Sequence, residues 1–270
     1  MAHPGKVEVP IQHLVQDRAA EPRQDAVAVE EPLEIRLDGE PVAVVMRTPG
    51  NDMELAVGFL FGEGILSKPE QVLSVAYCTD TSEESAGNVV NVLAEGANPE
   101  AFEAARRSVY ASSSCGLCGK TTLASVRLVA PEIEPIGPLS RSVIAELPGR
   151  LQAQQQLFEA TGGIHAAALC TTSGEVLLVR EDIGRHNACD KIVGAMVLRE
   201  DWPLRKRILV LSGRASFEMI QKAAMAGIGA VVAVSAPSSL AIDIAQELQI
   251  TLVGFARRGT MNLYCGEIVP

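Results

Sequence analysis

The sequence predicts a two-part fold in which a smaller N-terminal α+β unit is followed by a larger α/β layer. In the first half, short runs of alternating apolar and polar residues are typical of half-buried strands. In the second half, short Val, Ile and Leu runs alternate with longer helical patterns, as they do in a mainly parallel sheet covered by helices. We therefore expect a flexible arm over residues 1–25, a small α+β domain over 26–111 and an α/β domain over 112–270.

The composition is that of an ordinary globular protein. At 270 residues with 47% apolar side chains, the chain can bury a core without disulfides or metal ions. Its 33 acidic and 23 basic side chains give a formal charge of -10, which disfavours non-specific binding to nucleic acid or anionic membranes. No stretch approaches the roughly 18 apolar residues of a membrane helix, and the first residues hold no apolar run. We expect a cytoplasmic protein with neither nucleic acid nor a membrane as its partner.

The first half supplies three clear elements. Residues 33–48 alternate around Asp38-Gly39, which predicts a β-hairpin. Asp52 is then expected to cap a helix, and a further strand is expected at 89–94. One face of that helix would carry Leu55, Ala56, Phe59 and Leu60. Residues 1–25 are polar, contain Pro and Gly, and are expected to take no part in the core.

The second half alternates between the two kinds of element. Helices are expected at 119–129, 140–160, 187–199, 216–226 and 239–247. Strands are expected at 165–171, 175–180, 207–212, 230–235 and 250–255. Ser140 is a candidate cap, Pro148 is expected to divide the second helix, and Gly162-Gly163 to end it.

The loops that follow four of these strands share Gly, Ser and Arg. In open parallel sheets ligands bind beyond the carboxyl ends of the strands, and three of these loops run into helix N-termini, which favour anions. The loops lie at 180–187, 212–216, 235–239 and 255–259, and their arginines are Arg180, Arg185, Arg214, Arg257 and Arg258. Guanidinium groups suit bidentate phosphate contacts, so a phosphate-bearing ligand is expected there. Ordinary helix caps and a solvated salt-bridge network are the alternatives.

Two of the six cysteines are paired by spacing. Cys115 and Cys118 lie in SSSCGLCGK, directly before a helix-forming stretch, where the helix dipole and Lys120 favour the nucleophilic thiolate. The other four, Cys78, Cys170, Cys189 and Cys265, are expected to be small buried hydrophobic residues.

A single Cys-x-x-Cys pair fits a persulfide carrier, a redox dithiol or half of a zinc site. His165, His186, Cys170 and Cys189 could complete a zinc site, but none forms a second close pair. His165 is followed by two alanines, so the His-x-Glu of a zinc deaminase is missing. His186 can be a helix-anchoring histidine or a proton carrier.

Seven segments of the chain together resemble the formate dehydrogenase accessory sulfurtransferase family, FdhD. They are TPGNDMELAVGFLFGEGI (48–65), SSCGLCGK (113–120), TGGIHAAAL (161–169), REDIGRHNACDKIVG (180–194), SGRASFEMIQKAAMAGI (212–228), SAPSSLAIDIA (235–245) and TLVGFARRGTMNLY (251–264). The resemblance covers residues 27–265, and REDIGRHNACDK together with CGLCG is its most specific part.

The resemblance implies a sulfurtransferase that is needed for formate dehydrogenase activity. It implies a cytoplasmic homodimer that takes sulfur from a cysteine desulfurase, holds it as a persulfide on Cys115 with help from Cys118, and passes it to the bis-molybdopterin guanine dinucleotide molybdenum cofactor. A non-catalytic chaperone of that cofactor is the first alternative, and a zinc or redox module the second.

The resemblance also implies where the cofactor binds. The family's binding stretch falls on Phe255, Ala256, Arg257, Arg258, Gly259 and Thr260. The strand-end loops add further candidate cofactor-binding residues, which are Arg185, Ser212, Gly213, Arg214 and Ser235. The larger half would have a cytidine-deaminase-like fold without the deaminase metal site.

Overall fold

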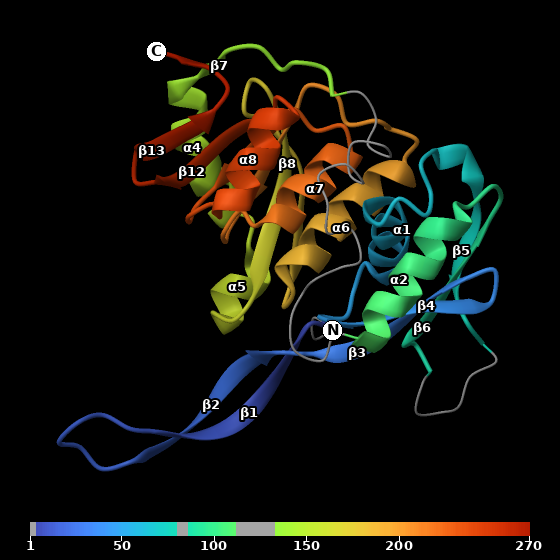
Figure 1. Ribbon diagram of the computed structural model, residues 1–270. Helices are drawn as coiled ribbons and strands as arrows, with labels where there is room; N and C mark the ends of the chain where they lie inside the picture. Colours follow the sequence, from blue (N-terminus) through green and yellow to red (C-terminus); the bar gives the residue numbers. More distant parts are fainter. Residues whose placement is uncertain (1–3, 80–85, 112–132) are drawn as a thin grey trace.

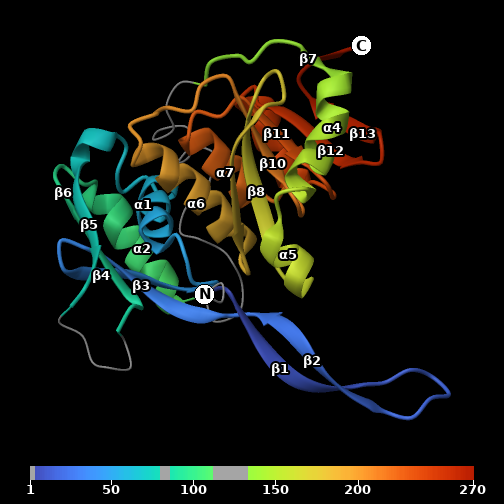
Figure 2. The same ribbon diagram turned by 180° about the vertical axis from the view of Figure 1, so that it is seen from behind.

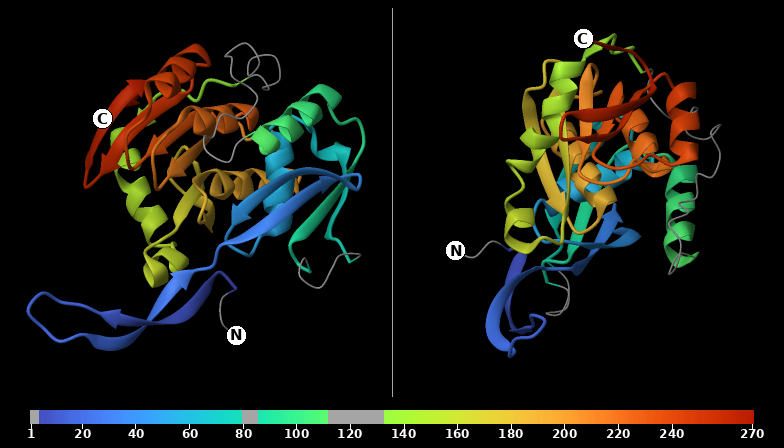
Figure 3. Two further views of the ribbon diagram at one scale, coloured as in Figure 1. Left: turned by 60° about the horizontal axis from the view of Figure 1, so that its bottom comes forward. Right: turned by 90° about the vertical axis from the view of Figure 1, so that its left-hand side faces the viewer.

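A computed structural model describes residues 4–79, 86–111 and 133–270 of the chain (Figure 1). A six-stranded sheet with helices on both faces forms the larger part, and a four-stranded sheet forms the smaller part. A long two-stranded hairpin projects from the body (Figures 1 and 3). Within the described ranges, no helix is both long and apolar enough to cross a membrane.

The larger sheet is mixed, so the expectation of a mainly parallel sheet is wrong. Its order is β13-β12-β11-β10-β8-β9, and only the β10–β11 and β11–β12 pairs are parallel. The strands are β8 (His165–Thr171), β9 (Val176–Asp182), β10 (Arg207–Leu211), β11 (Ala230–Ala233), β12 (Thr251–Arg257) and β13 (Thr260–Cys265). Tight turns join β8 to β9 and β12 to β13, and such short links can only connect antiparallel strands.

Helices cover both faces of this sheet. One face carries α4 (Arg141–Gln152) and α5 (Gln156–Thr161), and the other carries α6 (Arg185–Val197), α7 (Phe217–Met225) and α8 (Ser239–Glu247) (Figure 2). Residues of β8 alternate between two core clusters, with Ala166 and Ala168 facing α4 while Ala167 and Leu169 face α6. Close to the C-terminus, β14 (Ile268–Val269) pairs with β7 (Leu139–Ser140).

The predicted strands of this half, and the helices at 187–199, 216–226 and 239–247, are confirmed to within two residues at each end. The helix expected at 140–160 is not divided at Pro148, which lies inside α4. The chain leaves the helix at Ala153–Gln155 instead, where Gln154 and Gln155 donate shorter-range bonds to Leu151 and Gln152. The helix expected at 119–129 lies outside the described residues.

The smaller sheet has the order β4-β3-β6-β5. Its strands are β3 (Glu31–Leu37), β4 (Glu40–Arg47), β5 (Val72–Tyr77) and β6 (Val89–Ala94), and a short 3-10 turn η1 (Pro69–Gln71) precedes β5. The hairpin around Asp38-Gly39 and the strand at 89–94 are confirmed. Strands β5 and β13 and helix α2 (Pro99–Ala111) were not expected from the sequence.

Helix α1 (Asp52–Gly62) is buried almost all round, because it lies between the smaller sheet and α6 (Figure 1). Asp52 does not cap it, contrary to expectation. Asn51, at φ 58°, takes that position, and the Asp52 carboxylate accepts hydrogen bonds from Gly50 N at 3.1 Å and Arg47 Nη2 at 2.8 Å. The carboxylate still lies in the first turn, where it complements the helix dipole.

The N-terminal segment forms regular strands, which were not expected from its sequence, and the flexibility of this arm stays a prediction. Strands β1 (Lys6–His13) and β2 (Glu21–Ala28) pair antiparallel over their full length. The period-2 alternation of Val7, Val9 and Ile11 is the strand signal that the sequence analysis overlooked. The expected division of the chain at residue 112 stays a prediction.

Two glycines bring the two parts of the molecule into direct backbone contact. A Cβ placed on Gly58 of α1 would lie 1.8 Å from the Asp190 carbonyl oxygen of α6. A Cβ on Gly194 would lie 1.8 Å from the Glu54 carbonyl oxygen of α1. The two helices can therefore cross at this distance only because neither position carries a side chain.

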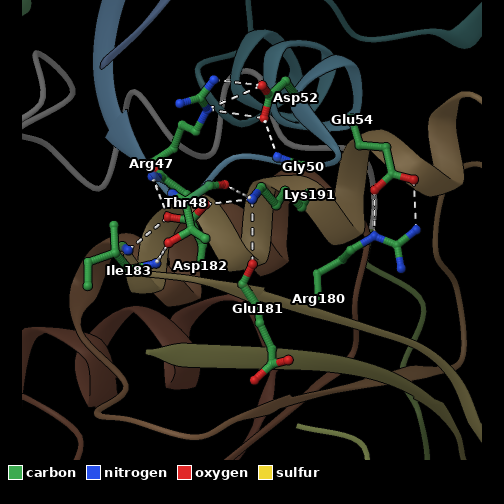
Figure 4. A network of polar contacts seen from close by, with 12 residues as sticks. Arg47, Thr48, Gly50, Asp52, Glu54, Arg180, Glu181, Asp182, Ile183 and Lys191 are labelled. Carbon is green, nitrogen blue, oxygen red and sulfur yellow. Dashed lines mark hydrogen bonds and ion pairs between the residues drawn. The ribbon is translucent and has the colours of Figure 1, made fainter. Parts of the chain in front are cut away.

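A buried polar network lies beside this crossing (Figure 4). Lys191 Nζ is 2.6 Å from Asp182 Oδ2 and 2.9 Å from the Thr48 carbonyl oxygen, to which it donates. Thr48 N donates to Asp182 Oδ2, and Thr48 Oγ1 accepts from Ile183 N, both at 3.2 Å. Asp182 and Lys191 are almost fully buried, so each compensates the charge of the other. The network fixes the end of β9 against the segment before α1.

We expect Gly58→Ala to reduce the free energy of unfolding by about 3 kcal/mol or more, because the two helix backbones would have to separate. Gly149→Ala is the matched control: Gly149 is an exposed residue of α4 with open space around its Cβ position. That control should stabilise the protein by about 0.5–1 kcal/mol, through helix propensity. Urea unfolding followed by circular dichroism measures both changes, and equal stabilities would contradict the proposed crossing.

Candidate functional site

The carboxyl ends of β9, β10, β11 and β12 lie at one edge of the six-stranded sheet, called here the carboxyl edge. Because β8 runs opposite to β10, its first residue, His165, lies at the same edge. The four loops singled out in the sequence therefore do share an edge, although the sheet is mixed. Three of them lead into α6, α7 and α8, as expected.

Hydrogen bonds between successive loops continue the sheet beyond its strands. Ser212 Oγ accepts from Ala166 N at 2.9 Å, and Ser212 N donates to the Ala166 carbonyl at 3.0 Å. Ser235 N donates to the Gly213 carbonyl at 3.2 Å, and Phe255 N donates to the Ser235 carbonyl at 3.1 Å. These hydrogen bonds join the loops into one connected row that contains Ser212, Gly213, Ser235 and Phe255. Many of the hydrogen-bonding groups in this row are therefore already used to hold the loops together.

The predicted binding stretch ends in a tight turn between β12 and β13. Arg258 and Gly259 form its two-residue loop with φ values of 50° and 76°, which is the geometry of a type I′ turn. Thr260 Oγ1 donates to the Arg257 carbonyl at 2.9 Å and closes the turn. The Arg257 guanidinium lies 6.0 Å from the centre of the Phe255 ring. Arg257 and Arg258 are exposed and make no ion pair within the described part of the chain.

The other two residues of the stretch are held differently. Phe255 has φ 51°, which is rare for a bulky side chain, and it lies at an irregularity in the β12–β13 pairing. Strained backbone of this kind gathers at functional sites. Ala256 is 1% exposed and packs in the core on the α4 side of the sheet, so its side chain cannot reach a ligand.

A cleft of about 1010 Å³ opens between the Arg257–Gly259 turn and the helices on the α4 face of the sheet. It is lined by Ala145, Glu146, Pro148, Gly149, Arg150, Leu151, Gln152, Ala153, Gln155, Phe158, Gly162, Gly163, Ile164, His165, Ser212, Val234, Arg257, Arg258 and Gly259. The one carboxylate of this lining, Glu146, is paired with Arg150. Two unpaired guanidiniums therefore make the cleft locally positive in an acidic chain, which suits an anionic ligand.

Not every predicted arginine joins this cleft. Arg180 Nη2 and Nε bind the Glu54 carboxylate of α1 (Figure 4), so the expectation that it serves the ligand edge is wrong. The alternation of side chains along β9 points Arg180 towards α1. The local sequence does not show that Glu54 of α1 lies there. Arg214 is exposed, and Arg185 is half-buried at the start of α6; neither residue lines the cleft.

A cluster that the sequence analysis did not assemble lies at the starts of α6 and α7. His186 Nε2 is 3.9 Å from Glu218 Oε2, and interaction with His186 and then Ser216 lowers the pKa of the Glu218 carboxyl to about 2. Burial, followed by the charges of Arg185 and His186, lowers the pKa of His165. Only the pairing of α6 with α7 and the reversed direction of β8 bring these groups together.

The cysteines divide into three groups. Cys115 and Cys118 lie outside the described residues, so their roles stay predictions. Cys170 and Cys189 are fully buried, as expected, and burial raises the pKa of each thiol to about 12. Cys78 and Cys265 are only half-buried, which corrects the expectation for these two. Among the side chains that the structure describes, no three of His, Cys, Asp and Glu gather as metal ligands.

We expect brief alkylation of the native protein with iodoacetamide at about pH 8 to spare Cys170 and Cys189, because burial leaves too little accessible thiolate. Peptide mass spectrometry reads the modified positions. The same reagent in urea should modify both thiols and serves as the control. Modification of either thiol in the native state would contradict its burial.

Comparison with known proteins adds an independent finding. A family model described as the FdhD/NarQ family matches residues 28–268. The sulfur carrier protein FdhD of Streptomyces coelicolor is 48% identical over 258 residues, covering 93% of this chain and 91% of that protein. The sulfur carrier protein FdhD of Nocardia farcinica is 50% identical over 247 residues, covering 90% and 88%.

A solved structure supports the fold. The crystal structure of a protein from Desulfotalea psychrophila, described as a candidate formate dehydrogenase accessory protein, superimposes with a TM-score of 0.76. The alignment covers 97% of this chain and 98% of that one, at 22% sequence identity. The likeness extends over both sheets and both sets of helices.

Proposed function

The chain belongs to the FdhD/NarQ family, and on this basis we propose that it is a sulfur carrier needed for formate dehydrogenase activity. It accepts sulfur from a cysteine desulfurase as a persulfide on Cys115. It then delivers that sulfur to the bis-molybdopterin guanine dinucleotide molybdenum cofactor of formate dehydrogenase. Relatives named as sulfur carriers, at 48–50% identity over most of the chain, support the sulfur-carrying part.

The observation that carries the cofactor part is the cleft beside the Arg257–Gly259 turn. A bis-guanine dinucleotide carries four phosphates, and the cleft offers two guanidiniums on a tight turn that form no ion pair among the residues described. Its volume of about 1010 Å³ is at the upper end for small-molecule sites, which fits part of a large ligand. Ser212 adds a further polar residue to this lining.

The proposed sulfur transfer balances in two steps. First, the Cys115 thiolate attacks the outer sulfur of the donor persulfide; a sulfur–sulfur bond forms at Cys115, and the donor cysteine leaves as a thiolate. Second, the Cys118 thiolate attacks the Cys115 sulfur, a disulfide forms between the two, and the outer sulfur leaves as hydrosulfide towards the molybdenum. The two thiols supply the two electrons that this release requires.

Three further proposals follow from the resemblance. The protein works in the cytoplasm, it is a homodimer, and its larger layer is related to the cytidine deaminase fold. The six-stranded sheet covered on both faces supports the last of these. A non-catalytic cofactor chaperone is the rival function. The cleft is also compatible with it, because the cleft could hold an anion without either cysteine.

We expect Cys115→Ala to abolish sulfur loading. The purified protein is incubated with a cysteine desulfurase and cysteine, and its intact mass is measured for one added sulfur atom. Wild type and the control Cys78→Ala, which removes a half-buried thiol, should both gain the sulfur. Cys118→Ala should gain it and keep it until an external thiol is added. Loading that persists in Cys115→Ala, or formate dehydrogenase activation by that variant, would leave the chaperone as the better function.

We expect the double variant Arg257→Ala, Arg258→Ala to bind GDP about tenfold more weakly or worse, because two charge-assisted contacts are lost. The loss should shrink as salt concentration rises, since exposed phosphate contacts are screened. Calorimetric titration measures both effects. The matched control, Arg199→Ala with Arg205→Ala, removes the same charge from exposed positions away from the cleft. Equal affinity in the two double variants would move the nucleotide elsewhere.

A further inference from the structure

The cleft holds a half-exposed aromatic ring that the phosphate contacts do not use. Phe158 of α5 lines the cleft and is 39% exposed, whereas Phe59 and Phe61 are buried in the core. A large apolar side chain that is exposed inside a cleft is a stronger indication of ligand binding than one on a convex surface.

The backbone around Phe158 is firmly held. The N–H groups of Leu157 and Phe158 both donate to the Glu181 carboxylate of β9 at 2.9 Å. Gly162 N donates to the Phe158 carbonyl at 2.8 Å where α5 ends. The side chain of Leu157, the residue before Phe158, is buried and fixes this helix to the body of the protein. The ring is thus presented from a fixed backbone, so a ligand that contacts it would not have to order this segment.

The surroundings of the ring define the chemistry of its partner. The Arg257–Gly259 turn lines the same cleft and supplies positive charge for phosphates. Gly162 and Gly163, which follow α5, have no side chains, and open space surrounds their Cβ positions except for Thr161 O at 3.8 Å from that of Gly163. A positive groove that contains an aromatic side chain suits a nucleotide, with the phosphates on the arginines and the base stacked on the ring.

We infer that Phe158 is a binding residue for the nucleobase, and that the guanine ring of the ligand stacks on it while Arg257 and Arg258 contact the phosphates. This inference rests on the proposed function. It adds a residue outside the arginine stretch and makes α5 the base-recognising wall of the cleft. Stacking tolerates any flat base, so Phe158 provides affinity for the ring and does not by itself select guanine.

A tryptophan at this position reports the contact directly. The chain has a single tryptophan, Trp202, whose ring packs edge-on against Phe61 at 4.9 Å and whose Nε1 donates to the Ser67 carbonyl. Trp202 does not line the cleft, so the emission of wild type should not respond to nucleotide. In Phe158→Trp, GDP should quench the emission, whereas ribose 5-phosphate, which has no base, should leave it unchanged.

Affinities separate stacking from general packing. Phe158→Ala should bind GDP about tenfold more weakly, as expected for the loss of one stacked base. Phe158→Leu keeps apolar bulk without the ring and should lose most of the same affinity. Both variants should bind ribose 5-phosphate as wild type does. Leu240→Ala, which truncates an exposed residue of α8, is the off-site control and should change nothing.

The outcomes distinguish this inference from the proposed function. If wild type binds GDP through Arg257 and Arg258 while all Phe158 variants match it, the inference is overturned and the proposed function stands. Equal weakening of GDP and ribose 5-phosphate in Phe158→Ala would show a structural effect and would also overturn it. Quenching by neopterin without quenching by GDP would assign the ring to a pterin. If wild type binds no GDP at all, this inference and the cofactor part of the proposed function fail together, whereas the sulfur loading of Cys115 tests the sulfur-carrying part separately.

Discussion

The contact between Gly58 and Gly194 is the constraint on which the rest of this molecule depends. It lets the backbones of α1 and α6 touch, and so places the segment before α1 against the end of β9. Only at that separation can Lys191 reach both Asp182 and the Thr48 carbonyl, with the charges shielded from water. The smaller sheet is therefore part of the support for the carboxyl edge, because the loop into α6 is held from both sides.

The carboxyl edge combines a rigid row of loops with a positive cleft. Main-chain hydrogen bonds join the loops from β8 to β12, so the turn at Arg257–Gly259 is presented from a fixed base. In a chain with a charge of -10, two arginines at one turn that make no ion pair with any described residue give this turn a local positive charge. Such a site can hold an anionic ligand while the acidic remainder of the surface discourages non-specific anions. In the proposed function, ligand binding and sulfur chemistry belong to different segments of the chain.

The strengths and errors of the sequence analysis have physical causes. Local patterns located the hairpin at Asp38-Gly39, the strands of the larger sheet and α6 to α8, because side-chain periodicity is a local property. They failed for strand direction, since two tight turns made the sheet mixed. They also failed for Arg180, whose guanidinium is bound by Glu54, more than a hundred residues away in the chain. The alternation in β1 was present but was outweighed by polar composition.

The sequence by itself determined the family, the spaced pair Cys115 and Cys118, and the arginine stretch at 255–260, because these are fixed by the covalent order of residues. Tertiary structure alone decided that both arginines of this stretch make no ion pair with the residues that the structure describes, that Ala256 is buried, and that His165 and Phe158 line the same cleft as Arg257. The physical reason is that distant segments meet only where strand directions, helix crossings and buried charges are satisfied together, and no local pattern carries that information.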